Sequence, residues 1–226
     1  MRAVLWDMDG TLVDSEKLWD LGIQELYRRH DRELPAEVRT ATVGGSAETV
    51  MDIVYADLGL NPDPDHMAQT ADWLHEYVGE LFATGLPWCA GAKEMLDQLL
   101  AADIPMGLVT NTRRDLTEKA LDSIGRHYFS VSVCADEVPS GKPAPDPYLR
   151  AAQLLGLNPA DCLAIEDSLI GSEAAVLAGC AVLVIPNDIE VPTSARRRRV
   201  DTLDQLTPAD LRAVHTEIGD LTERSA

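Results

Sequence analysis

Short apolar runs alternate with longer amphipathic segments along most of the chain. The first run covers residues 4–6, and later runs cover residues 105–110, 131–134, 162–166 and 181–185. The later runs are separated by segments of about 10 to 15 residues whose apolar positions recur at helical spacing. Strands and helices that alternate in this way are typical of βαβ units. The pattern therefore predicts an α/β protein whose parallel sheet is covered by helices on both faces.

The alternation is interrupted once, directly after the first apolar run. From residue 15 to residue 86 the apolar positions, among them Trp19 and Ile23, follow helical spacing, and no segment has the pattern of a strand. A block of this length inserted after one strand indicates a second, all-helical domain. We therefore expect a core domain of residues 1–14 and 87–226 and a helical domain of residues 15–86.

The composition supports a globular protein and limits its partners. With 226 residues, of which 46% are hydrophobic, the chain can form one large domain or a domain with a sizeable insertion. Its 38 acidic and 19 basic residues give a net charge of −19. Because nucleic-acid binding depends on positive charge, we expect no nucleic-acid partner. An anionic substrate must instead be attracted by local positive groups.

Several features bear on where the protein works. The four cysteines have no paired spacing, which favours small buried residues in a reducing compartment. The five histidines show no metal-ligand spacing. No segment has the apolar length of a membrane helix, and the chain begins with a strand pattern rather than a signal peptide. We expect a cytoplasmic protein with no membrane partner.

A run of four arginines, Arg196–Arg199, stands in the C-terminal part of this acidic chain. A solvated loop before a last short helix explains the run better than a phosphate-binding patch, because four residues provide little binding area. The residues after about Val214 are polar and charged, and we expect them to fray.

Two acidic residues follow the first predicted strand. Asp7 and Asp9 are separated by one residue and precede Gly10, which indicates a turn. Ligands of open parallel sheets bind just beyond the carboxyl ends of the strands, so both carboxylates are placed where chemistry is expected. One could stay ionised as nucleophile and metal ligand while the other is protonated as an acid. A turn that caps the next helix is the alternative explanation.

Polar side chains follow later strands as well. Thr110 and Asn111 provide a hydroxyl and an amide that can bond phosphate oxygens, although both residue types also cap helices. Lys142, held between Gly141 and Pro143, could place a fixed positive charge at the same edge of the sheet, although a lone lysine in a loop is more often solvated. The segment is not a P-loop, because the required earlier glycine and the following Ser or Thr are missing.

The predicted strand at residues 162–166 ends in a pair of carboxylates, Glu166 and Asp167. Carboxylates after a buried run are costly unless a cation or hydrogen-bond donors compensate them. Together with Asp7 they form an oxygen-rich group suited to Mg²⁺. A capping box for the next helix is the alternative for Asp167 and Ser168 taken alone.

These segments, taken in order, resemble the four motifs of the haloacid dehalogenase superfamily. They are Asp-x-Asp-Gly-Thr from Asp7, Thr110-Asn111, Gly141-Lys142-Pro143 and Glu166-Asp167-Ser168-x-x-Gly171. The resemblance covers about residues 2 to 210 and implies a Rossmann-like, doubly wound parallel sheet. The block at 15–86 looks like the small α-helical cap of the β-phosphoglucomutase-like members, and the segment at 13–20 is most similar to the hexose and hexitol phosphatases.

The resemblance implies a Mg²⁺-dependent phosphatase that acts on small-molecule phosphomonoesters, such as sugar or polyol phosphates, through an aspartyl-phosphate. Asp7 would attack phosphorus, and Asp9 would protonate the leaving alkoxide and then help activate water. The phosphoryl oxygens would be held by Thr110, Asn111 and Lys142. The ligands of Mg²⁺ would be Asp7, the Asp9 carbonyl and Asp167, with Glu166 bound directly or in the second shell. We expect a monomer or a weak dimer.

Specific residues separate this activity from others of the superfamily. A dehalogenase needs neither Asp9 nor the metal-binding carboxylates, so their presence disfavours one. β-Phosphoglucomutases resemble this chain but have a histidine in the first cap helix and a Lys-Gly-x-Ser-Arg segment. This chain has Trp19 and the segment Val43-Gly44-Gly45-Ser46-Ala47 instead. A hydrolase is therefore favoured over a mutase.

Two further alternatives concern the motifs and the cap. A catalytically idle binding module would have lost a nucleophile, acid or metal ligand, and none is missing. Hydrolysis of phosphoglycolate or of a nucleotide stays open, because the cap selects the substrate and the sequence does not show which cap residues face the core. The candidates are Trp19, Ser46, Trp73 and Tyr77.

Overall fold

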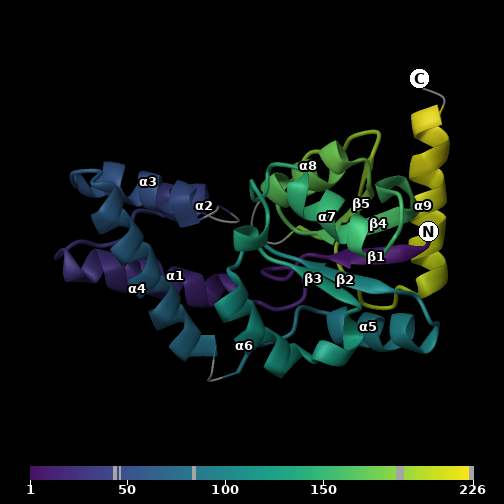
Figure 1. Ribbon diagram of the computed structural model, residues 1–226, viewed down its shortest axis with the longest axis horizontal. Coiled ribbons are helices and arrows are strands. Elements are labelled where there is room, and N and C mark those ends of the chain that lie inside the picture. The colour runs from purple at the N-terminus through teal and green to yellow at the C-terminus, as the bar shows by residue number, and fades with distance from the viewer. Residues whose placement is uncertain (43–44, 46, 83–84, 187–190, 224–226) are drawn as a thin grey trace.

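A six-stranded parallel sheet is the centre of the computed structural model, which describes residues 1–42, 45, 47–82, 85–186 and 191–223. The strand order is β3-β2-β1-β4-β5-β6, and every neighbouring pair is parallel (Figure 1). The strands are β1 (Ala3–Trp6), β2 (Met106–Val109), β3 (Val131–Val133), β4 (Cys162–Glu166), β5 (Ala181–Val184) and β6 (Arg197–Arg199). The predicted α/β fold with a Rossmann-like parallel sheet is confirmed.

The central strand β1 is covered on both faces. All four of its residues are fully buried, and they alternate between two hydrophobic clusters. Val4 and Trp6 belong to the cluster that includes Leu108 of β2, whereas Leu5 belongs to the cluster that includes Ala164 of β4. A strand buried on both faces has no position for a polar side chain, which explains the unbroken apolar run.

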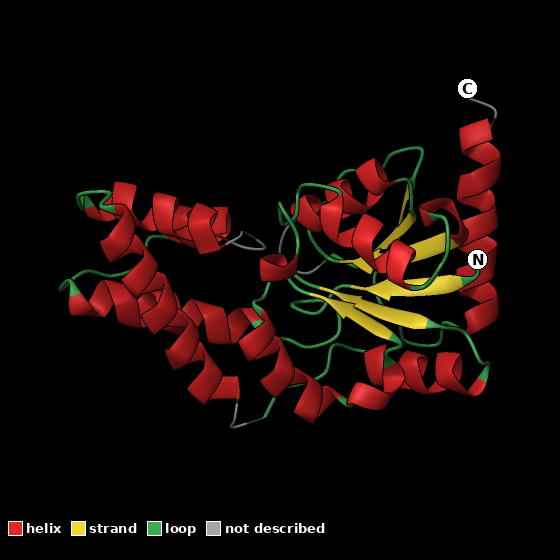
Figure 2. Ribbon diagram, in the orientation of Figure 1, coloured by secondary structure: helices red, strands yellow, loops and turns green. Residues whose placement is uncertain are grey.

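Helices cover both faces of the sheet (Figure 2). One face is covered by α5 (Ala92–Ala101), α6 (Arg114–Ile124) and α9 (Pro208–Glu223). The opposite face is covered by α7 (Asp146–Leu154) and α8 (Leu169–Ala178). Short 3₁₀ helices lie in the connections at Arg126–Tyr128, Ala135–Glu137 and Pro159–Asp161. The sheet is therefore doubly wound, as the sequence predicts.

Four helices between β1 and α5 pack on one another beyond the end of the sheet, on the left of Figure 1. They are α1 (Glu16–Arg29), α2 (Ala36–Thr42), α3 (Ala47–Leu58) and α4 (Pro64–Phe82). α1 and α4 approach closely, since a Cβ added at Gly22 would lie 2.7 Å from Leu74 Cδ1. We call these helices the cap; the division into residues 1–14 and 87–226 against 15–86 stays a prediction, which this arrangement supports.

The segments that lead into and out of the cap lie side by side. The Asp14 backbone N–H donates to the Pro87 carbonyl at 2.9 Å, and the Cys89 N–H donates to the Leu12 carbonyl at 2.9 Å. Val13 and Trp88 form an isolated antiparallel bridge between the same segments. The cap is therefore connected to the core at one place, through two chain segments that are hydrogen-bonded to each other.

Two expectations for the C-terminal part are wrong. Residues 197–199 form the edge strand β6 rather than a loop, because the β5 edge offers backbone groups and the Arg198 side chain reaches Glu217 of α9 at 3.0 Å. The segment after Val214 does not fray at that point, since α9 continues to Glu223 and its apolar residues Leu211 and Ile218 are buried against the sheet.

The cysteines behave as the sequence predicts. All four are free thiols, and Cys134, Cys162 and Cys180 are buried. Burial raises the pKa of the Cys162 thiol to about 11, so it stays protonated at neutral pH. Across the described ranges, none of the helices combines the length and the apolar character needed to cross a membrane.

Candidate active site

Asp7 lies at the carboxyl end of the central strand β1, where its backbone N–H donates to the Ile165 carbonyl at 3.0 Å. Its carboxylate is only 6% exposed and is held from two sides. Thr11 Oγ1 donates to Oδ2 at 2.9 Å, and Lys142 Nζ donates to Oδ1 at 2.6 Å. The carboxylate therefore has a fixed position at the end of the sheet that faces the cap.

Lys142 links Asp7 to the end of β4. Its ammonium lies 2.7 Å from Glu166 Oε1, and Tyr148 of α7 donates its hydroxyl to the same oxygen at 2.5 Å. The backbone of Lys142 is fixed by Asn111, whose Oδ1 accepts from the Lys142 N–H at 2.8 Å and whose Nδ2 donates to its carbonyl at 3.0 Å. The structure thus brings Asn111 to the site mainly as the residue that positions Lys142.

Asp9 has a different environment, built from hydroxyl groups. Its Oδ2 accepts from Thr112 Oγ1 at 2.7 Å and from Thr110 Oγ1 at 3.1 Å. Its Oδ1 accepts from Ser15 Oγ at 2.5 Å and from the Trp19 indole N–H at 3.4 Å. Thr110, expected at the phosphoryl oxygens, is fully buried and directed at Asp9 here.

Sequence reasoning missed three of these partners: Ser15, Thr112 and Tyr148. Thr112 lies directly after the Thr110-Asn111 motif, and Ser15 follows Asp9 by six positions, so their hydroxyl chemistry was visible. Their direction was not, because it depends on how separate loops meet. Tyr148 gives no local signal, since it is 18 positions from Glu166 and lies on the buried face of α7.

Three buried carboxylates form the candidate metal site. Asp7, Glu166 and Asp167 offer oxygens that all lie within 4.8 Å of one another. Hard carboxylate oxygens in this arrangement fit Mg²⁺, which also retains water ligands. Glu166 already accepts from Lys142 and Tyr148, and Ser168 Oγ donates to it at 3.3 Å. This saturation fits contact between Glu166 and a metal through water better than direct ligation.

Close packing fixes the Glu166 carboxylate. A Cβ added at Gly171 of α8 would lie 2.0 Å from Glu166 Oε1 and 2.2 Å from Oε2. Any side chain at this position would therefore displace the carboxylate, so only glycine fits. The Glu166 carboxylate therefore explains sterically why the fourth motif has a glycine at this position.

The buried charges of the site do not balance. The pKa of Asp7 is raised from 3.8 to about 7, first by burial and then by the nearby charges of Glu166 and Asp9, whereas Lys142 opposes the rise. Burial alone would lower the pKa of Lys142, but Asp7 and Glu166 more than compensate, so its pKa is raised and the ammonium stays charged. One lysine thus faces several carboxylates, and a bound divalent cation would relieve the excess negative charge.

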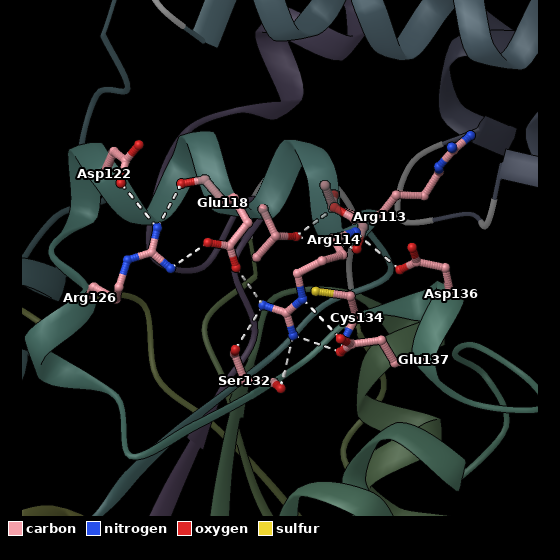
Figure 3. A network of polar contacts seen from close by, with 11 residues as sticks. Arg113, Arg114, Glu118, Asp122, Arg126, Ser132, Cys134, Asp136 and Glu137 are labelled. Atoms are coloured by element: carbon pink, nitrogen blue, oxygen red, sulfur yellow. Dashed lines mark hydrogen bonds and ion pairs between the residues drawn. The ribbon is translucent and has the colours of Figure 1, made fainter.

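The loop that carries Thr110, Asn111 and Thr112 is held by an ionic network at the start of α6 (Figure 3). The Arg114 backbone N–H donates to Asp136 Oδ1 at 3.0 Å, and its guanidinium donates to Glu137 at 2.6 Å and to the Ser132 carbonyl at 3.1 Å. The preceding Arg113 crosses to Asp72 of α4 at 2.5 Å. The network therefore fixes the Asp9-binding loop against β3 and links it to the cap.

A cleft of about 910 Å³, including space open to solvent, separates the sheet edge from the cap. Its core side is formed by Asp7, Asp9, Asn111, Thr112, Lys142, Asp167 and Ser168. Its cap side is formed by Trp19, Asp20, Ile23, Thr42, Gly45, Val50, Met51, Ala71, Leu74 and His75. The charged residues and the helical cap thus enclose one space.

The four cap residues predicted as candidates for substrate selection differ in where they lie relative to the cleft. Trp19 lines the cleft and packs edge-on against His75 with ring centroids 5.3 Å apart. Trp73 and Tyr77 do not line it, and they contact each other with centroids 5.6 Å apart. Ser46 lies outside the described residues.

Comparisons with known proteins identify the family of the chain. The sequence profile of the haloacid dehalogenase-like hydrolases matches residues 1–179. Hexitol phosphatase A of Escherichia coli (strain K12) is 32% identical over 210 residues, covering 91% of this chain and 93% of that protein. Validoxylamine A 7′-phosphate phosphatase of Streptomyces hygroscopicus subsp. limoneus is 31% identical, covering 86% of this chain and 91% of that protein.

Solved structures give the same result for the fold. CbbY from Rhodobacter sphaeroides in complex with phosphate superposes with a TM-score of 0.81 at 26% identity, covering 94% of this chain and 99% of that one. A β-phosphoglucomutase from Clostridium difficile superposes with a TM-score of 0.86 at 19% identity, covering 96% and 98% of the two chains. The chain therefore belongs to the haloacid dehalogenase-like hydrolases, and it is a phosphatase of that family.

Proposed function

We propose that this phosphatase is Mg²⁺-dependent and hydrolyses small phosphomonoesters, with sugar or polyol phosphates as substrates, through an aspartyl-phosphate intermediate. The observation that carries the proposal is the contrast between two neighbouring carboxylates. Asp7 faces the Lys142 ammonium at 2.6 Å, beside Glu166 and Asp167, whereas Asp9 is held by hydroxyl groups. Carboxylates in different environments suit different roles, one as nucleophile and one as proton donor.

The chemistry takes two steps. In the first, Asp7 attacks phosphorus and forms a P–O bond while the ester P–O bond breaks, and Asp9 gives its proton to the leaving oxygen. In the second, Asp9 accepts a proton from water as the water oxygen attacks phosphorus, and the bond to Asp7 breaks. Inorganic phosphate leaves, Asp7 is ionised again, and Asp9 is protonated again.

Other residues hold the groups that react. Lys142 offsets negative charge on the phosphoryl oxygens, and Thr11 orients the Asp7 carboxylate from the opposite oxygen. Thr110 and Asn111, predicted to hold the phosphoryl oxygens, act in this proposal from the loop after β2, where Thr110 bonds Asp9 and Asn111 positions Lys142. Mg²⁺ held by Asp7, the Asp9 carbonyl and Asp167, with Glu166 through water, would supply charge neutralisation and orient the phosphoryl group.

The relatives support the substrate class without narrowing it to one compound. Hexitol phosphatase A and validoxylamine A 7′-phosphate phosphatase are named for phosphorylated polyhydroxy compounds. Phosphoglycolate phosphatases and a probable pseudouridine-5′-phosphatase of Drosophila melanogaster match at 29–30% and 29% identity. The mutase alternative has less support, because Trp19 occupies the cap position expected for a histidine. A non-enzymatic binding module has the least.

The setting of the reaction is also part of the proposal. Free, buried thiols suit a reducing compartment, so we infer a cytoplasmic enzyme. The high negative charge of the chain favours a monomer or a weak dimer over larger assemblies.

Phosphate release from a panel of esters tests the proposal. The panel contains hexose phosphates, hexitol phosphates, phosphoglycolate and nucleoside monophosphates, each with Mg²⁺ or with EDTA, and Asp7→Asn serves as the blank. We expect Mg²⁺-dependent release that is greatest for sugar or polyol phosphates and falls by about 10⁴-fold or more in the variant. Release that persists in Asp7→Asn would contradict the mechanism.

A further inference from the structure

The two walls of the cleft differ in charge. The core wall contains Lys142 and the carboxylates of Asp7, Asp9 and Asp167. The cap wall is mainly apolar, through Trp19, Ile23, Val50, Met51, Ala71 and Leu74. A substrate bound with its phosphate on the core wall therefore presents the rest of the molecule to a hydrophobic surface.

Positive charge is scarce in this space. Among the lining residues that the structure describes, Lys142 is the one lysine or arginine, and its ammonium lies 2.6 Å from Asp7 and 2.7 Å from Glu166. Among the described residues of the lining, the one cationic group thus already belongs to the phosphate end.

Two arginines next to residues of the lining are engaged with acids. Arg39 pairs with Asp20, and Asp20 itself lines the cleft with its negative charge. Arg113 pairs with Asp72 at 2.5 Å. Both arginines are therefore already paired with acids, and neither adds an unpaired positive charge to the cap wall.

His75 does not add a positive charge either. Its ring is buried against Trp19, and its Nδ1 lies 2.8 Å from the Ala71 carbonyl, which places a proton on that nitrogen. Burial lowers the pKa of His75, so the neutral ring predominates at pH 7. With its proton on Nδ1, the neutral ring has Nε2 as an acceptor for a hydrogen bond from an uncharged hydroxyl.

From this charge distribution we infer that the site selects monophosphates whose leaving group carries no charge, and discriminates against esters with a second phosphate or a carboxylate. The inference rests on the proposed function. An anion on the leaving group would lose water at the apolar wall, would face Asp20 and would gain no cation there. Sugar and polyol monophosphates satisfy the requirement, whereas sugar bisphosphates and phosphoglycolate do not.

Matched pairs of esters test the inference on the wild-type enzyme with Mg²⁺. One pair is fructose 1-phosphate and fructose 1,6-bisphosphate, and the other is 2-hydroxyethyl phosphate and phosphoglycolate, which differ by an alcohol against a carboxylate. We expect kcat/KM to be lower by about tenfold or more for the member of each pair that has a second anionic group. Comparable values within the pairs overturn the inference and leave the phosphatase intact. No hydrolysis of any ester overturns the proposed function itself.

A variant that adds a cation to the cap wall provides the converse test. Ala71→Lys places an ammonium on the wall at a half-buried position, and Gln69→Lys adds the same charge at an exposed position of α4 that does not line the cleft. We expect the preference for the ester with an uncharged leaving group to shrink by about tenfold in Ala71→Lys and to stay unchanged in Gln69→Lys. An equal change in both variants would assign the effect to overall charge and contradict the inference. If Ala71→Lys does not fold, His75→Lys makes the same test.

Discussion

The core wall of the cleft is polar and charged, whereas the cap wall is mainly apolar. On the core wall the carboxylates of Asp7 and Asp9 have defined hydrogen-bond partners, such as Lys142 for Asp7 and Thr112 for Asp9. On the cap wall most contacts are apolar, and Ile23 and Leu74 are typical. Polar networks require exact geometry, whereas apolar surfaces tolerate changes of shape. The comparison teaches that changes in the core should affect the reaction, and changes in the cap should affect the choice of substrate.

Apart from loss of the Asp7 nucleophile itself, the largest expected effect is that of Lys142→Met, which removes the cation between two buried carboxylates. Breaking a buried ion pair leaves uncompensated charge, so the metal-free protein should lose about 3–5 kcal/mol of unfolding free energy. With Mg²⁺, kcat should fall by about 10²–10³-fold because the phosphoryl charge is less well stabilised. Urea unfolding in EDTA and steady-state kinetics measure the two effects.

A matched control for this variant is Lys93→Met. Lys93 pairs with Asp97 at 2.9 Å on the surface, where both side chains are about half exposed at 49% and 50%. Surface pairs contribute little, so this variant should resemble the wild type in stability and activity. Equal losses in the two lysine variants would show that the core wall has no special role.

The second effect is a pH dependence of the unfolding free energy, whose direction Mg²⁺ should reverse. The pKa of Asp7 is raised from 3.8 to about 7, first by burial, so the metal-free native state holds a proton that the unfolded chain has already released. Stability of the metal-free protein should therefore decrease as the pH rises from about 4 to about 7, by about 1.4 kcal/mol for each unit of pKa difference. Bound Mg²⁺ favours the ionised carboxylate and should reverse the trend.

Unfolding measured across this pH range, with EDTA and with Mg²⁺, isolates the contribution of one residue. Other carboxylates titrate in the same range, so the informative quantity is the difference between the wild type and Asp7→Asn. A difference that does not change with pH in EDTA would show that Asp7 is ionised throughout.

The third effect is that of Gly171→Ala. The added methyl group would lie within 2.0–2.2 Å of the Glu166 carboxylate, so that carboxylate must move. We expect a loss of about 1–3 kcal/mol in stability and roughly tenfold weaker Mg²⁺ affinity. Gly219→Ala in α9 is the control, because no atom lies within 4 Å of a Cβ there, and it should leave the affinity for Mg²⁺ unchanged. Unchanged Mg²⁺ affinity in both variants would contradict the proposed role of Glu166 in binding Mg²⁺.

The smallest effect is expected on the cap wall. Ile23→Val removes one methyl group from the lining of the cleft and should cost about 1 kcal/mol of unfolding free energy. It should lower kcat/KM for a sugar phosphate a few-fold, roughly as a lost contact does, but leave kcat/KM for methyl phosphate unchanged. Ile53→Val, outside the lining, should change stability without changing this ratio. A change with methyl phosphate as large as with the sugar phosphate would place Ile23 in the reaction rather than in selection.

Much of the fold was predictable because a parallel strand buried on both faces needs an unbroken apolar run. The runs at 105–110 and 162–166 contain β2 (Met106–Val109) and β4 (Cys162–Glu166). β6 (Arg197–Arg199) escaped prediction because an edge strand is held by backbone hydrogen bonds, which any side chain allows. Arginine stems can also lie along apolar surface while their charged ends reach acids, so a charged run does not exclude a strand.

The site was predictable to the extent that chemistry follows the ends of strands. Asp7 and Asp167 directly follow β1 and β4, Lys142 lies in the connection after β3, and the structure brings all three to one cleft. The directions of Asn111 and Thr110 were not predictable, because each side chain turns to a partner from another loop. Hydrogen-bond partners far apart in sequence depend on tertiary packing, which local pattern does not encode.

The two paired segments that connect cap and core have a consequence for how such enzymes diversify. Because Asp14 and Pro87 are hydrogen-bonded neighbours, the whole cap occupies the place of a loop between β1 and α5. The entropy of closing a loop grows only slowly with its length, and here the closing contact is the same whatever is inserted. A helical module of another size or shape could therefore be exchanged at this junction while the catalytic edge stays untouched. New specificities then arise by replacement of a module rather than by rebuilding of a sheet.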